Sequence, residues 1–139
     1  MATRTDLFGA LKELSLLLVE DDELIRDSLR LFFESEGCRL NVRESAEEGL
    51  AAIRDQAYDI IITDFRLPGM DGIDFLKSVQ HLCPAAQKIL LTAYMNEQVL
   101  AEAFRLGVHQ FIEKPFSSDD LEEALAQLVE RRANTLPPA

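Results

Sequence analysis

Five short apolar runs alternate along this chain with stretches in which apolar residues recur every three or four positions. Runs of that length are typical of β-strands, and the intervening periodicity is typical of amphipathic helices. Because strand and helix patterns alternate strictly, the chain favours an α/β fold in which helices connect parallel strands. The predicted strands are Leu14–Val19, Arg39–Arg43, Tyr58–Thr63, Lys88–Thr92 and Gln110–Glu113.

The first and third predicted strands indicate how the sheet is covered. Leu14–Val19 and Tyr58–Thr63 are nearly continuous apolar runs, with no alternation between a core face and a solvent face. Strands of that kind are buried on both faces, as in a parallel sheet with helices above and below it. We therefore predict an α/β fold with a doubly wound, five-stranded parallel sheet. A length of 139 residues suits one domain, and 47% hydrophobic residues suffice for its core.

The intervening segments carry signals for helix ends. Ser45-x-x-Glu48 and Ser117-x-x-Asp120 are typical of helix N-termini. Gly37 and Gly107 follow apolar stripes and predict helix C-termini. The last helix is expected to end near Arg131–Arg132, where cations suit the helix dipole. The stripes comprise Leu24, Ile25, Leu29, Phe32 and Phe33; Ala46, Leu50 and Ile53; Ile73, Leu76 and Val79; Val99, Leu100, Ala103 and Phe104; and Leu121, Leu125 and Leu128.

The chain divides into one domain and two short flanks. Residues 1–13 are assigned to an N-terminal extension, in which we expect a short helix turn. Residues 14–132 form the domain. Residues 133–139 form a C-terminal tail or the start of a linker, since the prolines near the end cannot continue a helix.

Composition excludes several classes of partner. The chain has 25 acidic and 14 basic residues and a formal net charge of -11, with no cationic run, so we expect neither direct nucleic-acid binding nor membrane binding. It has no apolar run of transmembrane length and no signal-peptide pattern. Cys38 and Cys83 form no CxxC motif. We expect buried, unreactive thiols and a reducing, cytoplasmic location.

Four of the five predicted strands end on a chemically useful polar group. Glu20 and Asp21 follow the first strand, Asp64 follows the third, Thr92 ends the fourth and Lys114 follows the fifth. Taken singly, each has an ordinary explanation as a capping acid, a strand residue or a solvated lysine. Ligands of open parallel sheets, however, bind outside the carboxyl ends of the strands. The shared position at one edge therefore predicts a shared site.

Closely spaced carboxylates need a compensating charge. Two like charges 4 Å apart repel by roughly 4 kcal/mol at an effective dielectric near 20. A hard divalent cation removes this repulsion, and Mg²⁺ is commonly held by one or two carboxylates, waters and a phosphate. Lysine and threonine supply a positive charge and a hydroxyl donor for phosphoryl oxygens. The set suits a phosphoryl group carried by an aspartate, which is a known nucleophile for such transfer.

Four stretches resemble the receiver domain of two-component response regulators. They read LLLVEDDE, IIITDFRLPGMDG, ILLTAY and FIEKPF, in that order and at separations of whole strand–helix units. The resemblance covers about residues 14–131. It implies a (βα)5 flavodoxin-like receiver fold with strand order 2-1-3-4-5.

The resemblance implies a role for each polar residue at the strand ends. Asp64 corresponds to the phosphoacceptor that takes a phosphoryl group from a sensor histidine kinase or a phosphotransfer protein. Glu20, Asp21, Asp64 and the backbone carbonyl of Arg66 correspond to ligands of Mg²⁺, for which Mn²⁺ can substitute. Glu20 stands where the family more often has aspartate, so the side chain that would reach the metal is one methylene longer. Lys114 corresponds to the lysine that contacts the phosphoryl group.

Further positions correspond to the family's switch and rate-tuning sites. At the switch positions stand Thr92, whose hydroxyl would turn toward the phosphate, and Phe111, a phenylalanine where tyrosine is common. The bond preceding Pro115 resembles one that is cis in the family. Arg66 and Tyr94 match rate-tuning positions, and bulky groups there restrict an attacking water. We therefore expect slow autodephosphorylation, with a phosphoryl lifetime longer than seconds.

The resemblance also implies how the signal leaves the site. The predicted output surface combines the helix around Val99–Phe104, the strand Gln110–Glu113 and the last helix. Its partners would be a downstream effector domain or protein, or a second copy in a phosphorylation-dependent homodimer. The chain would be a phosphoacceptor and not a turnover enzyme, either standing alone or belonging to a longer regulator. Exposed candidates on this surface are Glu97, Arg105, His109 and Glu122.

Three other functions fit parts of the pattern. A receiver-like module could bind partners without phosphorylation, but the complete set of acids, threonine and lysine argues against it. A Mg²⁺-dependent phosphatase of the haloacid-dehalogenase type needs D-x-D after its first strand, whereas Asp64 is followed two residues later by Arg66. A flavodoxin-type cofactor binder needs a phosphate-binding loop after its first strand. This chain has the acidic stretch EDDE there, which would repel a phosphate.

Overall fold

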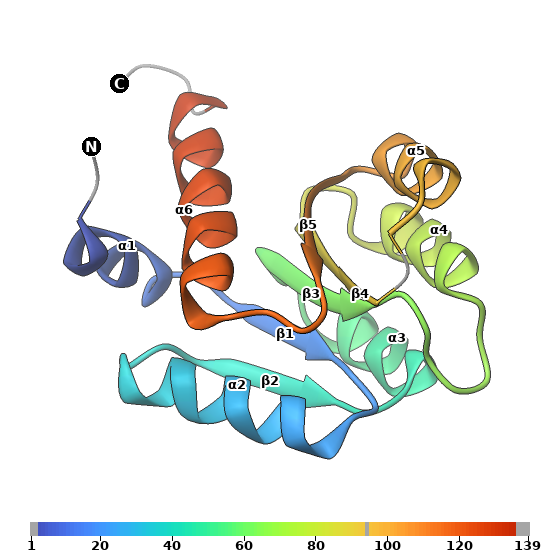
Figure 1. The fold of residues 1–139 in the computed structure, drawn as a ribbon, viewed down its shortest axis with the longest axis horizontal. Helices are drawn as coiled ribbons and strands as arrows, with labels where there is room; N and C mark the ends of the chain where they lie inside the picture. Colours follow the sequence, from blue (N-terminus) through green and yellow to red (C-terminus); the bar gives the residue numbers. More distant parts are fainter. Residues whose placement is uncertain (1–2, 94, 136–139) are drawn as a thin grey trace.

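The computed structural model describes residues 3–93 and 95–135, which fold as a central sheet between two layers of helices (Figure 1). Strands and helices alternate from the first strand onward, which confirms the predicted alternation. None of the helices in these described ranges is long and apolar enough to cross a membrane. The elements are α1 (Arg4–Leu11), β1 (Leu16–Val19), α2 (Glu23–Ser35), β2 (Leu40–Arg43), α3 (Ala46–Asp55), β3 (Ile60–Asp64), α4 (Gly72–Leu82), β4 (Gln87–Thr92), α5 (Glu97–Arg105), β5 (Val108–Glu113) and α6 (Ser118–Thr135).

The sheet has the predicted topology. All strand pairs are parallel and the order is β2-β1-β3-β4-β5, which confirms the doubly wound, five-stranded prediction. β3 lies at the centre, and all five of its residues are buried. The predicted strands are correct in number and kind, and their ends shift by at most two residues. The largest shifts are at the starts of β1, β3 and β5, which begin at Leu16, Ile60 and Val108.

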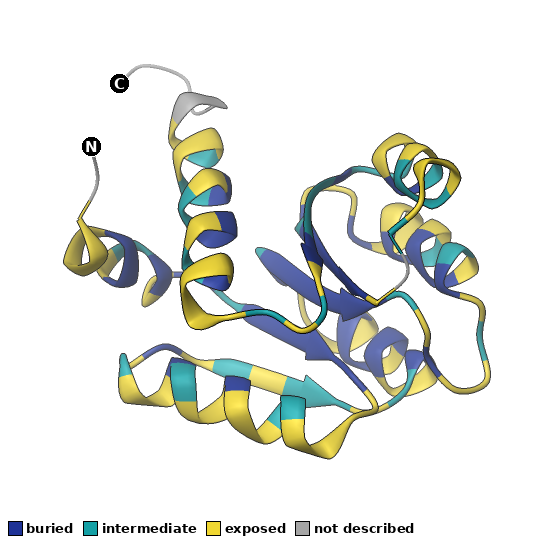
Figure 2. Ribbon diagram, viewed as in Figure 1, coloured by how far each residue is buried: buried dark blue, intermediate teal, exposed yellow. Residues whose placement is uncertain are grey.

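Alternating strand residues supply the cores on the two faces of the sheet. Leu18 and Ile62 belong to a cluster with buried residues of α1, α2 and α6. Leu17 and Ile61 belong to a second cluster with residues of α3 and α4. A smaller cluster joins β4 and β5 to α4 and α5. The buried residues accordingly lie along the strands and on the inner sides of the helices (Figure 2). Burial on both faces explains why the first and third strands are continuously apolar.

The N-terminal extension forms more structure than the short turn that was predicted. α1 begins with a capping box between Thr3 and Asp6 and packs beside α6. It buries Leu7, Phe8 and Leu11 in the cluster shared with α2 and α6. The first residues of the chain therefore contribute to the same core as the sheet.

Two residues assigned to apolar stripes face solvent. Leu24 is 78% exposed and Phe104 is 60% exposed. Leu24 lies one helix step away from the line of Ile25 and Leu29 that faces the sheet, on the same outer side as exposed Leu31. The ring of Phe104 packs edge-on against a neighbour on β5 instead of entering the core. The predicted stripes were therefore one residue too wide in both helices.

The last helix follows its predicted start but runs further than its predicted end. Backbone N–H groups of Ser117 and Asp120 are bonded reciprocally by each other's side chains, which confirms the cap. α6 then continues to Thr135, past the end predicted near Arg131–Arg132. Because the prolines lie beyond this point, nothing in the backbone forces an earlier end. The first three residues of the predicted tail are thus helical.

A lysine is buried near the start of β4. Lys88 is 2% exposed, and its Nζ donates hydrogen bonds to Gln80 Oε1 at 3.1 Å and to the Ala86 carbonyl at 3.0 Å. Both acceptors are uncharged. Because burial disfavours the charged form, the pKa of Lys88 lies below its ordinary value of 10.5. The ammonium is therefore a source of instability at neutral pH.

We expect Lys88→Met to raise the free energy of unfolding by about 1 kcal/mol at neutral pH, because an apolar chain of similar length needs no solvation. The folded-state pKa of Lys88 is lowered, so the cost of its charge is fully present at neutral pH and is lost as pH rises toward 10.5. The advantage of the methionine should shrink over that range. Urea denaturation of both proteins between neutral and alkaline pH measures the difference. A lower stability of the variant at neutral pH would contradict the prediction.

Candidate functional site

Three acidic side chains meet at the carboxyl edge of the sheet. Glu20 and Asp21 follow β1, and Asp64 ends β3. One carboxylate oxygen from each lies within 4.8 Å of the other two. Glu20 and Asp64 are buried, whereas Asp21 is exposed. The parallel pairing of β1 with β3 causes this convergence, since it sets Val19 beside Thr63 and so aligns the residues that follow.

Lys114 connects two of the acids. It follows β5, and its Nζ lies 2.6 Å from Glu20 Oε1 and 3.1 Å from Asp64 Oδ2. Burial alone would lower the pKa of Lys114, but the hydrogen bond to Glu20 and the charge of Asp64 outweigh it and raise that pKa. The ammonium therefore stays charged and offsets part of the repulsion between the carboxylates.

Glu20 is the most strongly perturbed acid of the site. Its side chain is fully buried, and this burial raises its pKa to about 7, although the hydrogen bond from Lys114 acts in the opposite direction. The nearby negative charge of Asp64 adds to the rise. The second oxygen, Oε2, accepts a hydrogen bond from the backbone N–H of Asp22 at 3.2 Å. Both oxygens are thus oriented, which suits a group that must present one of them to a cation.

The acidic run after β1 serves two purposes. Asp22 is the N-cap of α2, and its Oδ1 accepts from the N–H groups of Leu24 and Ile25 at 2.9 and 3.2 Å. Arg26, one turn into α2, donates to the carbonyls of Glu20 and Asp21 at 3.0 and 2.7 Å. These hydrogen bonds fix the backbone of the acidic run in a conformation in which the Glu20 side chain is buried. Arg26 was not among the predicted site residues, because its partners are backbone carbonyls, which leave no signal in the residue types.

A tight loop follows Asp64. The Asp64 Oδ1 accepts from the backbone N–H of Arg66 at 3.3 Å, and Gly69 adopts a φ of 79° that favours glycine. At the start of α4, a Cβ on Gly72 would lie 2.0 Å from the carbonyl oxygen of Phe65. Only glycine lets the helix approach the backbone next to Asp64 so closely.

We expect Gly72→Ala to lower the free energy of unfolding by about 2 kcal/mol, because the clash is with backbone that cannot move without displacing Asp64. Urea denaturation measures the change. Gly9→Ala is the matched control: a Cβ there meets nothing within 4 Å, and alanine favours a helix by about 0.5–1 kcal/mol. Equal effects of the two substitutions would contradict this account of the loop.

Three of the four predicted switch and rate-tuning residues, Thr92, Phe111 and Arg66, are among the residues that the structure describes. Thr92 is buried at the end of β4, and its carbonyl accepts from the backbone N–H of Lys114 at 2.9 Å. Phe111 is half-buried on β5 and packs against the small cluster shared with α5. Arg66 is exposed beside the acids. The peptide bond before Pro115 is cis. Tyr94 lies outside the described residues.

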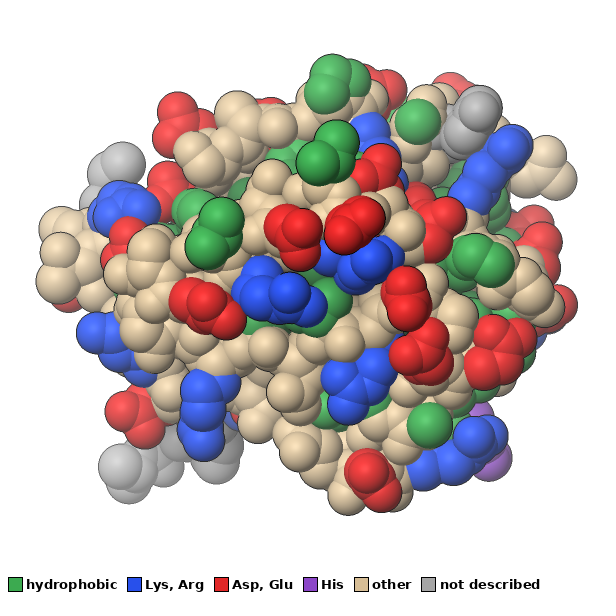
Figure 3. Space-filling view, turned by 90° about the horizontal axis from the view of Figure 1, so that it is seen from below, with side chains coloured by type: hydrophobic (Ala, Val, Ile, Leu, Met, Phe, Trp, Pro, Cys, Tyr) green, Lys and Arg blue, Asp and Glu red, His purple; other side chains and the backbone are tan. Residues whose placement is uncertain are grey.

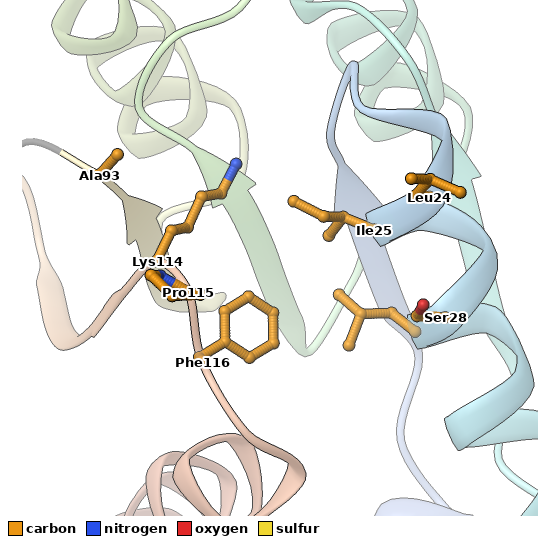
Figure 4. A pocket seen from close by; sticks show the side chains of 8 residues that line it. Leu24, Ile25, Ser28, Ala93, Lys114, Pro115 and Phe116 are labelled. Atoms are coloured by element: carbon orange, nitrogen blue, oxygen red, sulfur yellow. The ribbon is translucent and has the colours of Figure 1, made fainter.

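An apolar groove opens beside Lys114. Leu24, Ile25 and Ser28 of α2 face Ala93 and the segment Lys114–Phe116 across a groove of about 430 Å³ (Figure 4). The aliphatic chain of Lys114 lines this groove while its Nζ reaches toward the end of β3 (Figure 4). On the face of the molecule that includes α2, basic side chains alternate with acidic ones and form no single patch (Figure 3). The groove thus combines an apolar surface with access to the acidic site.

The predicted output residues are only partly where they were expected. Glu97 and Arg105 are exposed on α5. His109 is half-buried at the start of β5. Glu122 is half-buried on α6 and is ion-paired with Arg4 of α1, so the extension covers a residue that was predicted to be free for output.

The donor set suits Mg²⁺. Carboxylate oxygens are the hard ligands that this ion prefers, and one or two of them usually suffice together with waters and a phosphate. The exposed Asp21 leaves one side of the three-acid cluster open to water. The residues that would hold the ion are Glu20, Asp21 and Asp64, with the carbonyl of Arg66 as a further candidate.

Comparison with known proteins identifies the family. The family model of the response regulator receiver domain matches residues 16–126, most of the chain. The chain belongs to the response regulator receiver family. Receiver domains are signalling phosphoacceptors that bind Mg²⁺ at an acidic pocket, and they are generally not turnover enzymes. The matched range falls within the predicted domain and leaves α1 outside it.

Relatives and solved structures agree with this assignment. The receiver is 35% identical over 125 residues to the transcriptional activator protein PfeR of Pseudomonas aeruginosa, covering 89% of this chain and 41% of PfeR. It is 34% identical to the DNA-binding transcriptional regulator NtrC of Salmonella typhimurium, covering 82% of this chain and 24% of NtrC. The chain thus spans less than half of the length of each of these two relatives. A CheY-like receiver domain from Methanospirillum hungatei superposes with a TM-score of 0.81 at 29% identity, over 86% of this chain and 96% of that one.

Proposed function

We propose that this receiver accepts a phosphoryl group on Asp64 in a Mg²⁺-dependent reaction and transmits the change through its α5–β5–α6 surface. The observation that carries the proposal is the contact of Lys114 Nζ with Asp64 Oδ2, beside a cluster of three acids. A lone buried acid would have no such partners. Together they provide a nucleophilic oxygen and the positive charge needed next to it.

The transfer is an in-line displacement at phosphorus. A carboxylate oxygen of Asp64 forms the new P–O bond while the P–N bond of a phosphohistidine breaks, and the departing imidazole nitrogen keeps the electron pair. Asp64 needs no general base, because a carboxylic acid is ordinarily ionised at neutral pH. The ammonium of Lys114 would shift from the carboxylates toward the phosphoryl oxygens, which carry the negative charge during the transfer. When bound, Mg²⁺ supplies charge neutralisation at those oxygens.

The phosphodonor is proposed to be a sensor histidine kinase or a phosphotransfer protein. Such a donor must bring its phosphohistidine to an aspartate that is only 8% exposed. The groove beside Lys114 supports an approach from the α2 side, because its exposed Leu24 and half-buried Ile25 offer apolar contact next to the reacting atoms. Acetyl phosphate, being small, would not need that contact.

The output is proposed to follow from the burial of Thr92 and the position of Phe111. A phosphoryl group on Asp64 would draw the Thr92 hydroxyl toward it and free space for the Phe111 ring, which lies against the α5 side. Exposed Glu97 and Arg105 of α5 then lie on the altered surface. A solved relative, the beryllofluoride-activated NtrC4 receiver domain, is a dimer and is 26% identical with a TM-score of 0.78. We propose a phosphorylation-dependent homodimer or an effector domain as the partner.

Incubation with acetyl phosphate tests the reaction without a kinase. We expect one phosphoryl group per chain with Mg²⁺ present, a loss of at least about 100-fold when a chelator removes the metal, and recovery with Mn²⁺. Intact-mass measurement and peptide mapping give the amount and the residue. Light scattering of the same samples reports dimer formation.

Two outcomes would favour the rival functions. Phosphorylation that is absent under all metal conditions would favour a module that only binds partners. Continuous release of phosphate from small phosphomonoesters would favour a haloacid-dehalogenase-type phosphatase. Labelling on a residue other than Asp64 would overturn the proposed site.

A further inference from the structure

A second cavity, lined by polar groups, lies at the opposite edge of the sheet from Asp64. It has a volume of about 320 Å³ and lies where β4 and β5 begin, beside the last turns of α6. Ten residues line it, and none of them is acidic, although the chain as a whole carries a net charge of -11. Four of them carry cationic or titratable nitrogen: Lys88, His109, Arg131 and Arg132.

Local backbone geometry directs two of these side chains to the cavity. Lys88 pairs with Val108, whereas Ile89 pairs with Gln110, so His109 is the extra residue of a bulge. Bulges commonly re-aim a side chain next to a site. Gly107 adopts a φ of 89°, and a Cβ there would lie 3.2 Å from Lys88 Nζ. The turn before β5 therefore closes directly over the buried ammonium.

Most basic groups in this cavity have no acidic partner among the described residues. Lys88 donates only to uncharged oxygens, and no ion pair to it occurs among the residues that the structure describes. Burial and the positive charges of Arg131 and Lys88 lower the pKa of His109, which indicates that their fields overlap at its ring. Arg132 is different, because Asp59 already pairs with it at 3.0 Å. The basic groups of this cavity for which the described part of the chain provides no ion pair are therefore Lys88, His109 and Arg131.

One neutral group in the same lining needs a hydrogen-bond donor. Gln87 donates through Nε2 to the Leu128 carbonyl at 2.8 Å, which determines the orientation of its amide. Its Oε1 is buried and has no partner among the described atoms. A buried carbonyl oxygen without a donor is costly. A phosphate that keeps one proton would supply both missing partners. Its negative oxygens would pair with the basic groups, and its hydroxyl would donate to Gln87 Oε1.

We propose that this cavity binds inorganic phosphate through Lys88, His109 and Arg131, with Gln87 Oε1 accepting from the hydroxyl that HPO₄²⁻ keeps at neutral pH. The site is separate from Asp64 and does not depend on phosphoryl transfer. Lysine and arginine are the usual side chains for phosphate, as a point charge and as a planar fork respectively. The proposal also explains why β4 keeps a lysine that lowers its stability.

The two histidines make a direct test possible by NMR. Inorganic phosphate and sulfate are titrated into metal-free protein at constant ionic strength. We expect saturable shifts of the His109 ring signals with inorganic phosphate and a rise in the pKa of His109, while exposed His81 serves as an internal reference. Sulfate has the size and charge of phosphate but no hydroxyl at neutral pH, so it should bind about tenfold more weakly. Equal binding of sulfate would overturn the role of Gln87 and the choice of phosphate.

Variants distinguish a specific phosphate site from nonspecific electrostatic attraction of anions to the protein surface. Lys88→Met and Arg131→Ala should each weaken phosphate binding at least about tenfold. Lys77→Met removes an exposed lysine from α4 and is the matched control, expected to bind normally. Denaturation curves verify that each variant is folded. His109 signals that do not respond to phosphate, or equal losses in all three variants, would overturn the proposal. Asp64→Asn should bind phosphate normally, so a failure here is distinct from a failure of the proposed phosphoacceptor.

Discussion

Asp64→Asn is expected to abolish phosphorylation by acetyl phosphate, with a fall of at least about 100-fold, while the fold is retained. The amide has nearly the same shape as the carboxylate, but its oxygen carries no charge with which to attack phosphorus. The free energy of unfolding should stay within about 1 kcal/mol of the parent or rise, because one of the mutually repelling acids is gone. Intact-mass measurement and urea denaturation provide the two readouts.

The matched control for Asp64→Asn is Asp74→Asn. Asp74 is an exposed acid in the first turn of α4, close in sequence but outside the acidic cluster. Its substitution should leave phosphorylation unchanged. If Asp64→Asn were labelled as fully as the control, the phosphoacceptor would have to be another residue.

Lys114→Met is expected to lower the rate of phosphorylation by about 100-fold and the free energy of unfolding by about 2 kcal/mol. The first effect follows from losing the positive charge at the phosphoryl oxygens. The second follows because Glu20 and Asp64, both buried, lose the ammonium 2.6 and 3.1 Å away. Single-turnover labelling with acetyl phosphate and urea denaturation without metal measure the two losses.

Two further substitutions identify the cause of the loss at Lys114. Lys77→Met removes an exposed lysine from α4 and should change neither quantity. Lys114→Arg keeps the charge but alters its shape, so it should restore most of the stability and little of the rate. A variant Lys114→Met that is phosphorylated at the parental rate would refute the proposed role of this side chain.

The predicted fold was accurate because its signals are local in the sequence. Strands such as Ile60–Asp64 are apolar without interruption, and Ser45 and Ser117 stand at the predicted helix starts. The errors concern which residues of a helix are buried, because this depends on the elements that pack against the helix and not on its own sequence alone. Leu24 and Phe104 fit an apolar period, yet each lies one helix step outside the buried face.

The candidate site was partly predictable for a related reason. Parallel strands deliver the residues at their carboxyl ends to one edge, so Glu20, Asp64 and Lys114 could be grouped before any contact was known. The contact of α1 with Glu122 could not be predicted, because it joins residues 118 positions apart through side chains alone. The same holds for Arg26, whose partners are backbone carbonyls that carry no signal in the residue types.

Residue order alone was sufficient to establish the alternation of strands and helices, the acids, threonine and lysine at the strand ends, and the resemblance that these carry. These properties depend on hydrophobic period and on short motifs, which are local. Three-dimensional packing was needed to learn that Glu20 is fully buried with a pKa raised to about 7, that α1 joins the core, and that Lys88, His109 and Arg131 share a cavity. Burial, electrostatic shifts and cavities arise from the sum of distant neighbours, and no short stretch of sequence contains that sum.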